Sequence, residues 1–161
     1  MEDRWKSLEV WQLADELATH VYRTTKNFPK EEVYGLTSQL RRAALSVPTN
    51  IVEGYSRRGD RELARFTDIA LGSLAEVKYL LHFSNGFGFI NDREFKPLCE
   101  KANNLGAKLW KFYERVRHTP KAGKLCAEEA GTIRRVVVGE SMMVKRSRVF
   151  SMSAPSSLLA F

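Results

Sequence analysis

The most regular apolar pattern in the chain lies in residues 98–116, LCEKANNLGAKLWKFYERV. Apolar residues recur there at intervals of four, three, four, three and four positions: Leu98, Ala102, Leu105, Leu109, Phe112 and Val116. An α-helix completes one turn about every 3.6 residues, so this spacing places all of them on one face. Such a face is stable only when it packs against other apolar groups. The segment therefore predicts a helix, ending at about residue 117, that packs against partner helices.

Three earlier segments show similar spacing, over approximately residues 8–25, 31–56 and 60–84. Their apolar stripes comprise Val10, Ala14, Leu17 and Val21; then Val33, Leu36, Leu40, Ala43 and Val47; and finally Leu63, Phe66, Ala70, Leu74, Val77 and Leu81. We expect Ser7, Asp60 and Asn91 to cap the first, third and fourth helices, because short polar side chains accept hydrogen bonds from the free amides there. Glu94 completes a capping box with Asn91.

Two residues inside these segments predict local features. Pro48 lacks the amide hydrogen that would donate to the Ala44 carbonyl, which predicts a kink or a break in the second helix. Gly72 lies close to Ala70 and Ser73 in the sequence, and such small residues predict a close approach by a neighbouring helix.

The lengths of the segments and of their connections predict the architecture. Connections of about three to seven residues make consecutive helices antiparallel. We therefore expect an all-α, antiparallel up-down-up-down four-helix bundle over residues 1–120, with the second helix kinked near Pro48. The helical spacing is lost after Pro120, and we expect residues 121–161 to form an irregular or mobile C-terminal extension.

The composition is that of one soluble domain. The chain has 161 residues, of which 43% are apolar and 28% charged, enough to bury a core without disulfides. No stretch approaches the roughly 20 apolar residues of a membrane-spanning helix, and the N-terminus lacks a signal-peptide layout. We expect a cytoplasmic protein without membrane association.

The positive charge is unevenly distributed. The net charge is +7; residues 1–117 contain 19 Lys and Arg against 16 Asp and Glu, whereas residues 118–161 contain 7 against 3. A balance of this size permits binding to phosphate groups through counterion release but does not require it.

No combination of residues indicates catalysis or metal binding. Cys99 and Cys126 are far apart, and the three histidines, His20, His82 and His118, are isolated. No Glu-x-x-His motif of the kind used by di-metal bundles occurs. We therefore expect no enzymatic activity, no metal, no cofactor and no small-molecule substrate.

The strongest candidate surface is a group of six arginines: Arg41, Arg42, Arg57, Arg58, Arg61 and Arg65. Guanidinium groups donate paired hydrogen bonds to phosphate, which favours RNA or DNA binding. Two other interpretations stay open. One is a solvated rim in which the arginines pair with Glu53, Asp60 and Glu62, including Glu53 with Arg57 four residues later; the other is a contact between subunits. No aromatic residue is interleaved closely enough with the arginines to predict base stacking.

Residues 34–54, YGLTSQLRRAALSVPTNIVEG, resemble the signature of bacterial proteins encoded by intervening sequences in 23S rRNA genes, approximately YGLTSQLRRAA-x-S-x-P-x-N-I-x-EG. Weaker matches cover residues 8–14, 28–32 and 69–76. The resemblance implies a four-helix bundle and a ring-shaped homopentamer. A related bundle works with the reverse transcriptase of diversity-generating retroelements, which by analogy implies a surface that binds nucleic acid.

The signature contributes five further candidate residues: Gln39, Pro48, Asn50, Glu53 and Gly54. We expect them to serve the structure or a subunit interface, with Asn50 and Glu53 either satisfying backbone groups freed by the proline or bonding across a subunit boundary. The resulting hypothesis is a non-enzymatic homopentameric assembly protein that binds RNA or DNA. The alternative is a protein-interaction scaffold with no nucleic-acid role.

Overall fold

The computed structural model describes residues 3–118, and within them every regular element is helical. The four long helices are α1 (Glu9–Thr24), α2 (Leu36–Ser56), α3 (Asp60–Gly86) and α4 (Asp92–His118). A short 3₁₀ turn, η1 (Arg4–Ser7), precedes α1, and two others, η2 (Thr25–Asn27) and η3 (Lys30–Glu32), lie between α1 and α2. The predicted all-α class is confirmed. The predicted extension over residues 121–161 lies outside the described residues.

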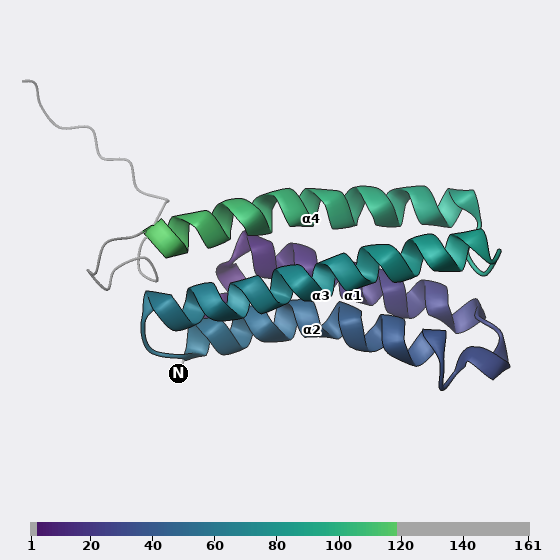
Figure 1. The fold of residues 1–161 in the computed structure, drawn as a ribbon, viewed down its shortest axis with the longest axis horizontal. Helices are drawn as coiled ribbons and strands as arrows, with labels where there is room; N and C mark the ends of the chain where they lie inside the picture. Colours follow the sequence, from purple (N-terminus) through teal and green to yellow (C-terminus); the bar gives the residue numbers. More distant parts are fainter. Residues whose placement is uncertain (1–2, 119–161) are drawn as a thin grey trace, which may run out of the picture.

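The four long helices lie side by side (Figure 1). α2 packs on α1 and α3, and α4 packs on the same two helices. The α1–α2 and α3–α4 connections lie at one end of the bundle, and the α2–α3 connection lies at the other end, where α4 also finishes (Figure 1). No helix among residues 3–118 is long and apolar enough to cross a membrane.

The predicted apolar stripes form the core. Every stripe residue of α1, α3 and α4 is buried, including Leu105 and Leu109, which are fully inaccessible. Val33 is the exception in the second segment: it precedes α2 and is 47% exposed. The prediction was wrong there because the helix begins at Leu36, whose amide donates to Glu32 Oε2 at 2.9 Å.

The helix starts agree with only one of the three predicted caps. Asn91 and Glu94 form the expected reciprocal pair: the Glu94 amide donates to Asn91 Oδ1 (3.0 Å), and Asn91 Nδ2 donates to Glu94 Oε2 (2.9 Å). Ser7 does not cap α1, since its hydroxyl donates to the Arg4 carbonyl. Asp60 is the first residue of α3, and Gly59, with a φ of 100°, takes the cap position.

The close approach between helices occurs at Gly54 and not at Gly72. A Cβ placed on Gly72 would have no neighbour within 4 Å, so the predicted close approach at this glycine is wrong. A Cβ on Gly54 would lie 2.8 Å from Phe66 Cβ and 3.3 Å from Leu63 Cα. The close approach therefore occurs where the last turns of α2 meet the first turns of α3.

α2 itself continues through the buried Pro48 without interruption.

Candidate nucleic-acid interface

The six candidate arginines fall into two separate groups. Arg41 and Arg42 belong to the first half of α2, whereas the other four lie in the α2–α3 connection or in the first two turns of α3. At about 1.5 Å per residue, roughly 22 Å of helix separates Arg42 from Arg57. The structure therefore does not gather the six residues into one surface. We call the four residues Arg57, Arg58, Arg61 and Arg65 the connection arginines.

Arg41 joins two helices. Its Nε donates to Thr25 Oγ1 at 2.8 Å, and its guanidinium lies 5.0 Å from the centre of the Tyr22 ring. Thr25 is buried, and its hydroxyl donates in turn to the Val21 carbonyl (2.8 Å). This arrangement ties α2 to the end of α1 through the Nε donor of Arg41 and its contact with the Tyr22 ring.

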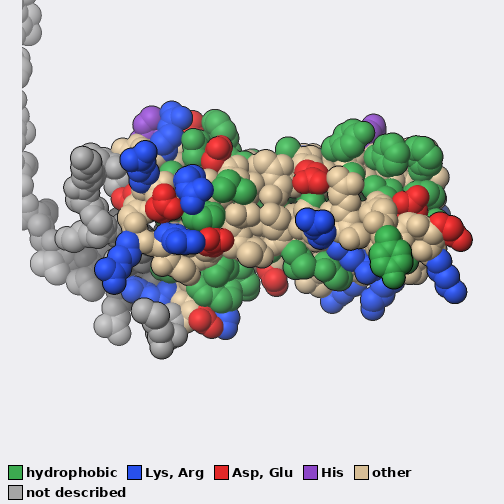
Figure 2. Space-filling view, turned by 60° about the horizontal axis from the view of Figure 1, so that its bottom comes forward, with side chains coloured by type: hydrophobic (Ala, Val, Ile, Leu, Met, Phe, Trp, Pro, Cys, Tyr) green, Lys and Arg blue, Asp and Glu red, His purple; other side chains and the backbone are tan. Residues whose placement is uncertain are grey.

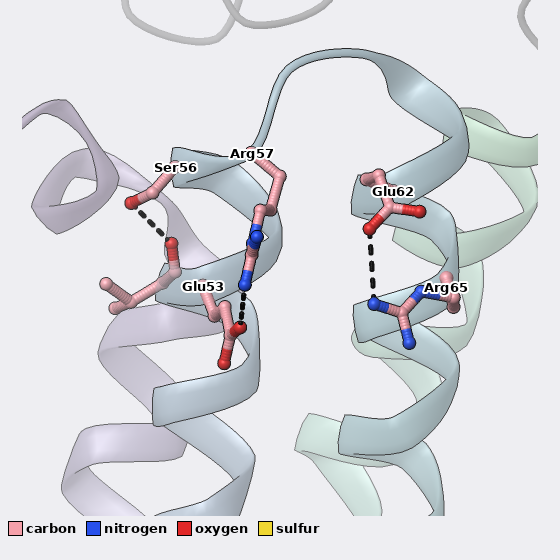
Figure 3. A network of polar contacts seen from close by, with 6 residues as sticks. Glu53, Ser56, Arg57, Glu62 and Arg65 are labelled. Carbon is pink, nitrogen blue, oxygen red and sulfur yellow. Dashed lines mark hydrogen bonds and ion pairs between the residues drawn. The ribbon is translucent and has the colours of Figure 1, made fainter.

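Two of the connection arginines pair with carboxylates of their own helices (Figure 3). Arg57 lies 2.7 Å from Glu53 on α2, and Arg65 lies 3.1 Å from Glu62 on α3. The hydrogen bond with Glu53, and then its negative charge, raise the pKa of Arg57. These pairs match the solvated-rim interpretation at two of the four positions.

An aromatic ring lies beneath these two arginines. The guanidinium of Arg65 is 4.3 Å from the centre of the Phe66 ring, and that of Arg57 is 5.7 Å from it. Phe66 is only 6% exposed, so its face is covered and offers no platform for a nucleotide base. Sequence reasoning missed this contact, because Phe66 counted only as a core residue; its position next to Arg65 was the available signal.

Arg58 and Arg61 are the two exposed connection arginines without a hydrogen bond or ion pair to another residue among those described. Figure 2 shows Lys and Arg side chains together with Asp and Glu side chains at this end, next to the grey residues. α4 finishes at the same end (Figure 1), and the chain beyond it contains 7 Lys and Arg against 3 Asp and Glu. Arg58 and Arg61 thus supply unpaired positive charge at this end of the described chain.

One of the five signature residues, Gln39, bonds directly to α3, and Asn50 supports a second polar contact between α2 and α3. Gln39 Nε2 donates to Glu76 Oε1 at 3.2 Å, and the hydroxyls of Ser46 and Ser73 lie 2.9 Å apart. Asn50 Nδ2 donates to both the carbonyl and the hydroxyl of Ser46, at 2.7 and 2.9 Å. Together they form a polar line along the seam between the two helices.

Of the two alternatives for Asn50 and Glu53, the contacts among the described residues do not support compensation for Pro48, and a bond across a subunit boundary stays a prediction. The carbonyl that Pro48 leaves without an amide belongs to Ala44. Asn50 bonds Ser46, and Glu53 bonds Arg57. Neither side chain therefore compensates for the proline.

Metal binding finds no support in the described part of the chain, where no three His, Cys, Asp or Glu side chains lie close enough to hold an ion. The one described cysteine, Cys99, is partly buried, and desolvation raises the pKa of its thiol. A thiol with a raised pKa is mostly protonated at neutral pH and is a poor nucleophile.

A family model described as "23S rRNA-intervening sequence protein" matches residues 6–111, which include α1, α2, α3 and most of α4. The chain belongs to this family. The match includes all six candidate arginines and all five signature residues of this 23S rRNA-intervening sequence protein.

A solved structure shares the fold. It is the crystal structure of a protein of unknown function from the S23 ribosomal protein family of Bacteroides thetaiotaomicron VPI-5482, with a TM-score of 0.59 and 18% identity over 65% of this chain and 98% of that one. At this identity the likeness concerns the fold alone. A comparison with curated proteins finds no match.

Proposed function

We propose that this 23S rRNA-intervening sequence protein is a non-enzymatic, homopentameric assembly protein that binds RNA or DNA phosphates at the end of the bundle where α2 connects to α3. The proposed bundle is up-down-up-down and antiparallel, with α2 kinked near Pro48. The alternating ends of the connections in Figure 1 support the antiparallel order, and the missing amide of Pro48 supports the kink.

The observation that carries the nucleic-acid proposal is the pair Arg58 and Arg61. Both are exposed and lack a partner among residues 3–118, so neither has to break an ion pair before it meets a phosphate. Arg57 and Arg65 already neutralise Glu53 and Glu62, which limits the repulsion that a phosphate would meet from these carboxylates. Contacts of this kind position a nucleic-acid backbone without selecting its sequence.

Charge reversal tests the proposal. The double variant Arg58→Glu/Arg61→Glu reverses both unpaired charges. We expect its affinity for RNA and for duplex DNA to fall at least about ten-fold, by a similar factor for every nucleic-acid sequence. Fluorescence anisotropy with labelled RNA and DNA measures the affinity.

The matched control is Arg93→Glu/Lys96→Glu. These residues are also exposed and lie at the start of α4, at the opposite end of the bundle, so the change in net charge is the same. Equal losses in both double variants would mean that only net charge matters, and unchanged binding in the first would exclude the connection arginines as the binding surface.

The alternative is a protein-interaction scaffold, favoured by the ion pairs of Arg57 and Arg65 and by the internal bonds of Arg41. It predicts that purification after nuclease treatment recovers a stoichiometric protein partner, and that RNA binding is weak in both wild type and variants.

A further inference from the structure

Two aromatic rings and a guanidinium group form a column on the last turns of α4. Trp110, Tyr113 and Arg117 follow one another at intervals of three and four positions, so they share one side of the helix. The ring centres of Trp110 and Tyr113 are 5.6 Å apart, and the guanidinium of Arg117 lies 5.7 Å from the centre of the Tyr113 ring. We call these three residues the α4 column.

The α4 column lies on the side of α4 that is turned toward α3. Gly106 precedes Trp110 by four positions and belongs to the same side of the helix. A Cβ on Gly106 would lie 3.1 Å from Lys78 Nζ and 3.5 Å from Leu74 Cδ2, both of α3. The column therefore borders the seam between α3 and α4.

The column is far from the connection arginines in the sequence but lies at the same end of the bundle. α4 finishes where α2 connects to α3 (Figure 1), and at about 1.5 Å per residue Trp110 lies roughly 12 Å before the last residue of α4. On α3, Arg61 begins a stripe at intervals of three and four positions that leads to the residue beside Gly106: Arg61, Ala64, Asp68, Leu71, Ala75 and Lys78. Arg61 and the α4 column thus flank one seam. Figure 2 shows hydrophobic side chains among Lys and Arg side chains at this end, next to the grey residues.

Trp110 presents part of its ring to solvent. It is 51% exposed, whereas Phe66, the ring beneath Arg57 and Arg65, is 6% exposed. Because an aromatic side chain buries about 150–250 Å² when fully covered, Trp110 leaves on the order of 100 Å² in water. One exposed ring by itself needs no explanation. An exposed ring beside unpaired arginines is, however, the combination that binds single strands, since bases stack on the ring while positive groups hold the backbone.

We propose that the α4 column is a stacking platform for unpaired nucleobases, so that the nucleic acid held at this end is single-stranded RNA or DNA, or an unpaired loop. The inference rests on the proposed function and names the substrate class of that binding end. Bases stack on the exposed part of Trp110, which Tyr113 supports from within α4, while Arg58 and Arg61 bind phosphates. Asp68, the one carboxylate of the α3 stripe, repels phosphates beside the rings, which favours bases there. The bases of a duplex are already paired and stacked, so a duplex gains nothing from the column.

Removal of the ring tests the platform in the full-length protein. We expect Trp110→Ala to weaken binding of a labelled oligouridine of about 12 nucleotides at least about five-fold, and to change binding of an RNA duplex of the same length less than about two-fold. Trp110→Phe keeps a ring and is expected to retain most of the affinity. The matched control is Phe87→Ala, since Phe87 is 64% exposed just after α3, at the other end of the bundle. This variant is expected to bind like wild type. Fluorescence anisotropy measures the affinities, and circular dichroism melts confirm that each variant is folded.

Two further readouts distinguish stacking from charge. Stacking releases no counterions, so Trp110→Ala is expected to leave the salt dependence of binding unchanged, whereas Arg58→Glu/Arg61→Glu makes it shallower. A base stacked on an indole quenches its fluorescence. We therefore expect oligouridine to quench the tryptophan emission of wild type and of Trp5→Phe, but not that of Trp110→Phe, although the last variant still binds.

The outcomes separate the inference from the proposed function. If wild type binds the duplex and the oligouridine, and Trp110→Ala binds both as wild type does or weakens both by the same factor, the stacking platform is wrong while binding at the basic end stands. If Trp110→Ala lowers the molar mass measured by multi-angle light scattering, Trp110 contacts another subunit and the inference is overturned. If wild type binds neither probe, the proposed function and the inference both fail.

Discussion

Gly54 is the residue on which the α2–α3 contact depends most clearly. A methyl group there would overlap Phe66 Cβ, at 2.8 Å, and press on the Leu63 backbone, at 3.3 Å. Because Phe66 Cβ is attached directly to its backbone, relief requires the helices to move apart. We expect Gly54→Ala to lower the free energy of unfolding by about 1–3 kcal/mol, as other overpacked core substitutions do, and urea denaturation measures the change.

Gly72 provides the control for the substitution at Gly54. It also lies inside a helix, but a Cβ there meets nothing within 4 Å. Since glycine inside a helix costs roughly 0.5–1 kcal/mol relative to alanine, Gly72→Ala is expected to stabilise the protein by about that amount. Effects of the same sign at both positions would show that helix propensity, not the close approach, sets the response at Gly54.

At the scale of elements, two ion pairs connect helices that are distant in the sequence. Lys101 of α4 pairs with Glu16 of α1, and Lys108 of α4 pairs with Glu9 of α1. The hydrogen bond from Lys101, and then its charge, lower the pKa of Glu16. Both pairs lie on the seam where α1 meets α4, so they help to fix how the first and last helices face each other.

The lowered pKa of Glu16 gives the pair a pH dependence. A carboxyl whose pKa is lower in the folded state contributes stability above its unfolded pKa, about 4.3, and loses it as the pH falls through the folded value. We expect Glu16→Gln to cost at most about 1 kcal/mol at pH 7, because the pair is exposed to solvent, and to cost nothing near pH 2. Urea denaturation at both pH values, with the exposed Glu114→Gln as control, measures the difference. A cost that persists at pH 2 would mean that packing, not charge, is lost.

The elements also show what the sequence could predict. The spacing of apolar residues predicted all four long helices and nearly all of their buried faces. The prediction succeeds because the α-helical repeat places residues three and four positions apart on one face, and an apolar face is buried. Val33 was assigned wrongly because the Glu32 carboxylate binds the Leu36 amide and delays the start of α2. The link between Glu16 and Lys101 was inaccessible to sequence reasoning, since the order of residues does not reveal which helices face each other.

The candidate site was predictable only in part. The six arginines were chosen by residue type, and this criterion ignores the roughly 22 Å of helix between Arg42 and Arg57. The packing of Arg41 on Thr25 and Tyr22 depends on where α1 ends beside α2. The pairing of Arg57 with Glu53 was anticipated, because residues four apart on a helix are neighbours.

At the scale of the whole molecule, different surfaces have different chemistry. Exposed rings and charges of both signs lie around the start of α2, whereas the end where α2 connects to α3 holds the unpaired Arg58 and Arg61. In the proposed homopentamer, each copy contributes one such basic end. Several such ends in one particle would strengthen nucleic-acid binding beyond that of one chain.

The central claim is that phosphate contacts at the basic end bind nucleic acid, and the salt dependence of binding tests it most directly. The affinity of the full-length protein for structured RNA is measured between about 50 and 200 mM salt. When the logarithm of the binding constant is plotted against the logarithm of the salt concentration, each phosphate contact contributes a slope of about −0.9 for duplex DNA and about −0.7 for single strands. We predict a steep negative slope that becomes shallower by one to two in Arg58→Glu/Arg61→Glu. Binding that does not change with salt, or a slope that the double variant leaves unaltered, would contradict the account.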